Sequence, residues 1–209
     1  MESFTTMQHE LERRHVTDGT AALVVLIDTD ARVIHCANAG DSRAILYRRS
    51  GDGHDGTVVA LSEDHKPENH RERARIRDAG GFVTESKRVN GVLALSRALG
   101  DCDLQPLVSY VPDITSQPLG DDVDFVVLGC DGLWDVATNE EAAALVKTTR
   151  SAQEAALKLR DHAFMMGSTD NVSVVVIRFD TSPSNSTTSS SSSSSSGASG
   201  TVPLVQVDT

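Results

Sequence analysis

Residues 124–135 read DFVVLGCDGLWD, an apolar, β-branched run that leads directly into an acidic turn. The run predicts a buried strand over 124–130. Asp131 follows at the end of this strand, and Asp135 lies further along the turn. Because aspartate beside glycine often does no more than shape a turn, this motif alone does not indicate any chemistry.

Two other acidic turns adjoin strands of the same kind. VIHCANA leads into Gly40-Asp41-Ser42-Arg43, and Ser168-Thr169-Asp170-Asn171 leads into VSVVVIRF. Carboxylates gathered at strand ends are the oxygen ligands that a hard divalent cation requires. Three such turns together favour a metal site over three unrelated turns.

Strand direction indicates which of these acids can meet. If strands 124–130 and 172–179 run antiparallel, Asp131 and Asp170 lie at the same edge of a sheet. Asp135 lies on a turn that brings it back toward the same ion. Carboxylates this close repel one another unless a cation neutralises them.

A similar count of directions applies to the first three strands, which we expect to form an antiparallel meander. In that arrangement Asp41 and the loop 51–56 lie at opposite ends. The loop spells Asp-Gly-His-Asp-Gly from Asp52 to Gly56, a sequence that suggests a ligand motif. Its position predicts a hairpin loop instead, and we do not count Asp52 or His54 as site residues.

The alternation of strand groups with helix groups predicts an α+β fold in which antiparallel sheets carry packed helices. Ser/Thr-x-x-Glu capping boxes at Thr138 and Ser151 indicate where two of the helices begin. Residues 86–112 lack a clear period and predict a loop with a short helical turn. The expected helices are 2–16, 68–79, 139–148 and 152–165, and the expected strands are 20–27, 32–38, 43–48, 57–61, 113–117, 124–130 and 172–179.

Composition limits the possible partners. The chain has 209 residues and a formal net charge of −11, which argues against nucleic acid or an anionic membrane surface as a partner. The three cysteines have neither disulfide nor zinc spacing, so reduced thiols in an intracellular, cytoplasmic or nuclear protein are expected. No signal peptide or membrane span is predicted. From residue 181 the chain is rich in serine, which predicts a disordered tail over 181–209.

The order of the motifs from GTAALVVLI (19–27) to GSTDNVSVVVIRF (167–179) resembles that of the type 2C metal-dependent Ser/Thr protein phosphatases. RVNGVLALSRALGD, CDGLWDV and STDN carry most of this resemblance. The resemblance implies an α-β-β-α architecture, an antiparallel β-sandwich flanked by helices, with metals at one end of the sandwich. It also identifies residues 1–180 as a partial, N-terminally truncated phosphatase domain, because the family's upstream Asp-Gly-His-Gly-Gly motif and its Arg-containing acidic segment are not found ahead of residue 18.

The resemblance further implies the chemistry. Asp131 and Asp170 correspond to ligands of a catalytic pair of Mg²⁺ or Mn²⁺ ions, and Asp41 and Asp135 to ligands of an additional ion. The substrates would be phosphorylated proteins, hydrolysed at phosphoserine or phosphothreonine by a metal-activated water. No catalytic residue is assigned, since those of the family lie in the upstream segment.

Three hypotheses about activity follow. The chain is an incomplete piece of an active phosphatase, which we favour, and is then weakly active or inactive alone. Alternatively, it is a pseudophosphatase that binds phosphoproteins or regulatory partners without turnover. In the third hypothesis it is a stable scaffold whose acids only form turns. The sequence does not indicate the pathway, the physiological substrate or the oligomeric state.

Other prominent polar residues have ordinary structural explanations. Trp134 is expected to pack in the core beside the site. Arg97 and Asp101 are expected to pair and hold their loop. His35 and His65 are expected to be packing or capping residues, although His65 lies near the edge of the proposed site.

Overall fold

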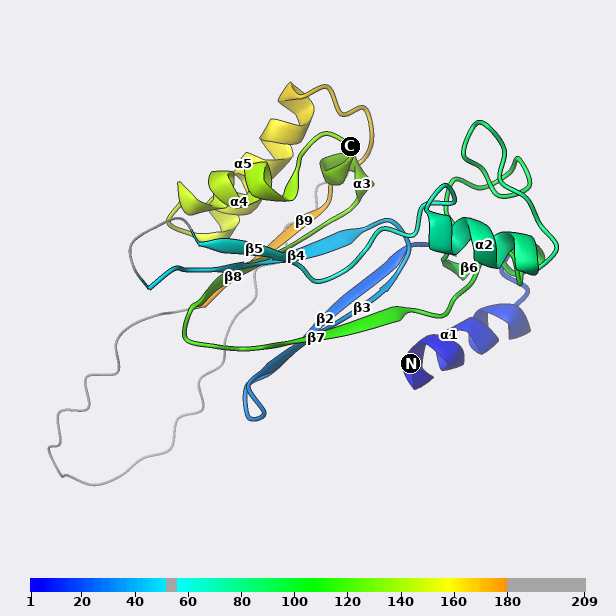
Figure 1. Cartoon of the computed structure of the whole chain (residues 1–209), viewed down its shortest axis with the longest axis horizontal. Coiled ribbons are helices and arrows are strands. Elements are labelled where there is room, and N and C mark those ends of the chain that lie inside the picture. Colours follow the sequence, from blue (N-terminus) through cyan, green and yellow to red (C-terminus); the bar gives the residue numbers. More distant parts are fainter. Residues whose placement is uncertain (52–55, 180–209) are drawn as a thin grey trace, which may run out of the picture.

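Two antiparallel sheets form the centre of the fold in the computed structural model, which describes residues 1–51 and 56–179. One sheet has three strands in the order β2-β3-β7, and the other has four in the order β5-β4-β8-β9 (Figure 1). A two-stranded pair, β1-β6, lies apart from both. The strands are β1 Gly19–Thr20, β2 Ala22–Asp28, β3 Val33–Ala39, β4 Arg43–Arg48, β5 Thr57–Ala60, β6 Leu99–Gly100, β7 Asp113–Pro118, β8 Val123–Gly129 and β9 Val174–Arg178.

The helices divide into two groups. Helices α3, α4 and α5 lie against the four-stranded sheet, whereas α1 and α2 lie at the far end of the three-stranded sheet (Figure 1). Among the described residues, every helix is too short or too polar to cross a bilayer. The helices are α1 Glu2–Arg13, α2 His70–Asp78, the 3-10 turn η1 Cys102–Leu104, α3 Asp131–Trp134, α4 Asn139–Lys147 and α5 Ala152–Met165.

Strands β4 and β8 supply the core on both faces of their sheet. Alternate side chains on one face pack under α4 and α5, where the rings of Tyr47 and Phe125 stack at 4.9 Å. On the opposite face, Leu46 and Val126 pack against the three-stranded sheet, and both are fully buried. A strand buried on both faces has no polar side to show, which explains the near-continuous apolar runs in the sequence.

The α+β class and the antiparallel sandwich are as the sequence predicted, but the expected meander is wrong. β2 and β3 pair, whereas β4 belongs to the other sheet. The chain crosses between the sheets at Gly40, whose φ of 144° suits glycine. A Cβ there would meet Ala21 Cβ at 2.4 Å, so the close approach of two backbones requires glycine. Short strands joined by turns have the same sequence pattern whether they continue one sheet or change sheets.

Other local predictions agree with the structure. Thr138 and Glu141 form the reciprocal capping box of α4, and Ser151 accepts from the Glu154 N–H at the start of α5. Gly51 and Gly56, the described ends of the loop 51–56, lie at the opposite end of β4 from Asp41. Asp52 and His54 fall outside the described residues, as does the expected tail 181–209.

The outer face of the three-stranded sheet carries exposed apolar side chains. Val24 and Ile114 lie on either side of Ala37 in the sheet register. Their exposed fractions are 50% and 49%, and neighbouring Leu26 is 62% exposed. β2 is also an edge strand of the sheet. An uncovered apolar face beside an open strand edge favours association with other chains.

We therefore expect the isolated chain to self-associate at micromolar concentrations, and Leu26→Lys to reduce this association. The new charge would have to be desolvated for the same face to be covered. Sedimentation velocity over a concentration series measures the effect. Gln153→Lys, at an exposed position of α5, adds the same charge elsewhere and serves as the control. A monomeric parent, or equal dissociation by both substitutions, would contradict the prediction.

Candidate metal centre

Sheet register brings the three acidic turns to one edge of the four-stranded sheet. Arg43 of β4 pairs with Gly129 of β8, and Gly129 pairs with Val174 of β9. Asp41 lies just before β4, Asp131 follows β8 as the first residue of α3, and Asp170 precedes β9. These three acids therefore come from neighbouring strand ends, and together with Asp135 they form what we call the acidic edge.

The acids at these strand ends influence one another electrostatically. Burial, together with the smaller effect of the charge of Asp131, raises the pKa of Asp41 to about 6. Burial also raises the pKa of Asp131, with added contributions from Asp170 and Asp135. The four carboxylates thus form a zone of mutual repulsion, which a divalent cation would relieve.

Three of these carboxylates also have a hydrogen-bond or ion-pair partner nearby. Asp131 Oδ1 accepts from the Gly132 N–H at 2.9 Å, and Asp170 Oδ1 accepts from the Asn171 N–H at 2.7 Å. Lys66 Nζ lies 2.5 Å from Asp135 Oδ1. Over residues 1–51 and 56–179, no group of three histidine, cysteine, aspartate or glutamate side chains is arranged as a ready metal site. The donor set is all oxygen and suits Mg²⁺ or Mn²⁺, but the side chains would have to turn toward the ion.

A cleft of about 450 Å³ opens beside Asp41 and Asp131. Leu93 and Leu95 form an apolar part of its wall, and Arg88 brings a positive charge. The Arg88 guanidinium also donates to the Val92 carbonyl at 2.7 Å. Sequence reasoning missed Arg88 and Lys66 as neighbours of the acids, although Arg88 begins RVNGVLALSRALGD, one of the motifs that carry the resemblance.

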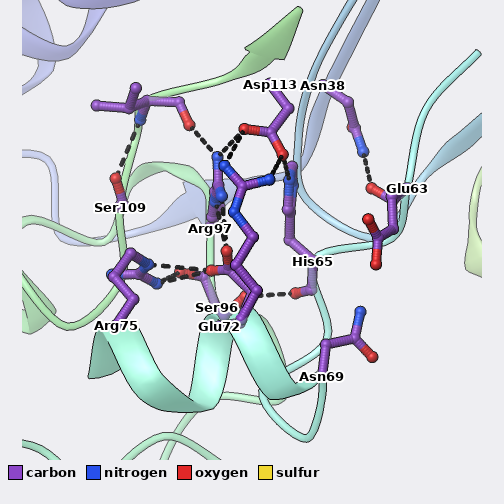
Figure 2. Close-up of polar contacts among 12 residues, drawn as sticks. Asn38, Glu63, His65, Asn69, Glu72, Arg75, Ser96, Arg97, Ser109 and Asp113 are labelled. Carbon is purple, nitrogen blue, oxygen red and sulfur yellow. Dashed lines mark hydrogen bonds and ion pairs between the residues drawn. The ribbon is translucent and has the colours of Figure 1, made fainter. Parts of the chain in front are cut away.

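Residues 86–112 contain more structure than the expected loop, and buried ion pairs hold them to α2. Arg97 is 4% exposed and Glu72 2%, and Arg97 Nη2 lies 2.6 Å from Glu72 Oε1 (Figure 2). Arg97 Nη1 also donates to Asp113 Oδ1 at 2.9 Å, and Arg75 donates to Glu72 Oε2 at 2.9 Å. Although burial alone would raise the pKa of Glu72, Arg97 and Arg75 lower it to about 2.

This network corrects the expected pair of Arg97 with Asp101. Asp101 instead lies in a left-handed turn, with φ of 44°, before η1. Trp134 packs in the core as expected, and its indole Nε1 donates to the carbonyls of Arg43 and Gly129. It thereby joins α3 to the ends of β4 and β8.

Breaking the buried pair should destabilise the fold. Glu72→Ala leaves the Arg97 guanidinium buried without its main partner, which costs about 3–5 kcal/mol in free energy of unfolding. Glu68→Ala is the control, because the pair of Glu68 with Lys87 is more exposed and worth about 0–1 kcal/mol. Urea denaturation followed by circular dichroism measures both. Similar losses in the two variants would show that the buried network contributes no special stability.

The raised pKa of Asp41 predicts how stability changes with pH. A folded-state pKa of about 6, above the ordinary 3.8, means that Asp41 contributes stability at low pH. This contribution is complete below the ordinary value and is lost as the pH rises through about 6. In metal-free buffer at neutral pH, Asp41→Asn should therefore raise the free energy of unfolding by about 1–2 kcal/mol, allowing for partial exposure.

The gain from Asp41→Asn should disappear as the pH is lowered toward 4, and thermal melts across this range measure it. Asp30→Asn, at an exposed turn, removes the same charge far from the site and should change little. If Asp41→Asn destabilises the chain at neutral pH, the carboxylate repulsion described above is wrong.

Comparison with known proteins places this arrangement in context. A family model described as "Protein phosphatase 2C" matches residues 1–172. "Probable protein phosphatase 2C 59" of Oryza sativa subsp. japonica is 42% identical over 184 residues, covering 85% of the chain and 54% of that protein. "Probable protein phosphatase 2C 71" of Arabidopsis thaliana is 41% identical over 189 residues, covering 88% of the chain and 40% of that protein. The chain thus spans about half, or less, of these relatives' length.

Solved structures give the same picture of the fold. The structure titled "Structure of a C.elegans sex determining protein" matches with a TM-score of 0.72 and 30% identity, over 83% of the chain and 43% of its own length. A serine-threonine phosphatase 2C from Toxoplasma gondii matches with a TM-score of 0.71 and 20% identity, over 86% of the chain and 64% of its own length. The second likeness, at this identity, concerns the fold alone.

Proposed function

Since the chain belongs to the protein phosphatase 2C family, we propose that it carries part of the active centre of a metal-dependent protein Ser/Thr phosphatase. The observation that supports this proposal is the meeting of acidic turns from three neighbouring strand ends beside a cleft. The substrates would be proteins phosphorylated on serine or threonine. Acids that served only to form turns would not need to lie close enough together to repel one another.

In this proposal each acid has a specific task. Asp131 and Asp170 would hold the catalytic metal pair, and Asp41 and Asp135 would hold a further ion. Bound Mg²⁺ or Mn²⁺ would supply an activated water and neutralise the phosphoryl oxygens. On binding the ion, Asp135 would release the Lys66 ammonium. Without metal, Lys66 would supply the positive charge that pairs with Asp135.

The cleft wall would take the rest of the substrate. Leu93, Ala94 and Leu95 offer apolar contact to the side chains that flank the phosphorylated residue. Arg88 places a guanidinium in the same cleft as Asp41 and Asp131, where it would add to the positive charge that meets a phosphoryl group. The proposed cleft thus accommodates both the charged group and its peptide.

A turnover assay tests the proposal, with a phosphothreonine peptide as substrate and excess Mn²⁺. We expect the chain alone to hydrolyse the peptide slowly or not at all, and a longer form that includes the family's upstream motif to be at least about a hundredfold faster. Asp131→Asn in the longer form should remove this activity, since a ligand of the catalytic metal pair is lost. A phosphothreonine peptide is used because slow hydrolysis of a small activated ester, such as p-nitrophenyl phosphate, would reflect metal alone.

Two results would contradict the proposal. Equal turnover by both forms would mean that other residues, such as the loop 52–55, replace the expected ligands. Unchanged turnover by Asp131→Asn would remove the acidic edge from the mechanism. Tight binding of the phosphopeptide without turnover in the longer form would instead favour the pseudophosphatase hypothesis.

A further inference from the structure

His65 lies at the junction between the acidic edge and the buried ion-pair network. It is 2% exposed, and its main chain and its ring both contact Gly40, the residue before Asp41. The His65 N–H donates to the Gly40 carbonyl at 2.9 Å, and the Gly40 N–H donates to His65 Nδ1 at 3.1 Å. The first bond, together with one from Asn38 Nδ2 to the same carbonyl at 3.0 Å, holds the peptide that leads into Asp41. The second bond holds the peptide that precedes Gly40.

The bond from Gly40 defines the tautomer of the ring. A backbone N–H can only donate, so Nδ1 must be the unprotonated nitrogen. The proton therefore lies on Nε2, which faces Asp113 Oδ2 at 3.3 Å. Burial lowers the pKa of His65 and the charge of Arg97 lowers it further, against the opposing charges of Asp113 and Glu72, which favours a neutral ring.

The opposite side of His65 is tied to the network that holds residues 96–113. The His65 carbonyl accepts from the Ser96 N–H at 3.0 Å and from Ser96 Oγ at 2.8 Å. Asp113, which faces the ring, also binds Arg97 (Figure 2). Its other ion pair is with Arg71. His65 thus connects the turn that presents Asp41 with β7 through its ring and with the Ser96–Arg97 segment through its carbonyl.

We propose that His65 is a positioning residue for the acidic edge: its Nδ1 lone pair, held in place by Asp113, fixes Gly40 and thereby the direction of the Asp41 carboxylate. This rests on the proposed function, in which Asp41 contributes to holding a divalent ion. Outer partners that orient a ligand typically contribute about 10–100-fold to metal affinity. The sequence had indicated His65 only as a packing or capping residue.

Two near-isosteric substitutions separate the two ends of the ring. The oxygen of His65→Asn stands close to Nδ1 and can still accept from the Gly40 N–H, but it does not reach Asp113. The amide of His65→Gln stands close to Nε2 and can still bond to Asp113, but it offers Gly40 no acceptor. A purely structural role for the buried ring would make both substitutions similarly harmful.

Two measurements on the full chain test the proposal: hydrogen exchange of the Gly40 amide by NMR, and Mn²⁺ binding by calorimetry. We expect His65→Gln to lose Gly40 protection and to weaken Mn²⁺ binding about tenfold or more. His65→Asn should keep the protection and bind Mn²⁺ within about threefold of the parent. His35→Gln is the matched control, because His35 lies on β3, its ring bonds to Ser116, and it should behave as the parent.

The outcomes separate this inference from the proposed function. Mn²⁺ binding that is lost in Asp131→Asn but unchanged in His65→Gln would overturn the positioning role and leave the metal centre intact. Equal Gly40 protection in the Asn and Gln variants would also overturn it, whether or not metal binds. If the parent binds Mn²⁺ no better than Asp131→Asn, the proposed function fails and the positioning role fails with it. If His65→Gln does not fold, His65→Met fills a similar volume with only a weak acceptor for Gly40 and no donor for Asp113, and its Gly40 protection and Mn²⁺ binding are compared with those of His65→Asn.

Discussion

Antiparallel pairing of β4 with β8 is the constraint on which the rest of this structure depends. The two strands are buried on both faces, under α4 and α5 on one side and against the three-stranded sheet on the other. Burial on both faces fixes the register, because a shift by one residue would exchange the two sets of core side chains. The same register places Arg43 opposite Gly129, so the turns that carry Asp41 and Asp131 must share an edge. The packing of the core therefore decides the geometry of the acidic edge.

The acidic edge works against the stability that this core provides. Burial and the charges of neighbouring carboxylates raise the pKa values of Asp41 and Asp131, and the charged forms of these two groups cost free energy whenever no cation is present. Lys66 offsets part of this cost through Asp135, and backbone N–H groups hold Asp131 and Asp170. In the proposed function, this stored repulsion is the reason that a divalent ion binds. Groups of side chains that lower the stability of the fold, as these carboxylates do, are typical of functional sites.

A small apolar core and a network of polar contacts together hold the region between α2 and β7. Its small core contains Ile76, Val89, Ala98 and Val108. The rest of the connection is polar: Arg97 joins Glu72 to Asp113, and His65 joins Asp113 to Gly40. Buried polar networks tolerate few alternative arrangements, since each unpaired group is costly. These contacts fix the position of this region relative to the acidic edge, although its sequence shows no regular period.

The sequence by itself determined the local features of this protein. Alternating apolar runs predicted most strands within a few residues, capping boxes marked α4 and α5, and the acidic turns indicated Asp41, Asp131, Asp135 and Asp170, because each of these signals arises between residues close in the chain. Only the tertiary structure decided that β3 and β4 belong to different sheets, since a crossing at Gly40 and a continued hairpin have the same local pattern. It also decided that Arg97 pairs with Glu72 rather than Asp101, and that His65 contacts Gly40. Those contacts join residues distant in the chain, and their partners depend on how the layers pack, which no local pattern records.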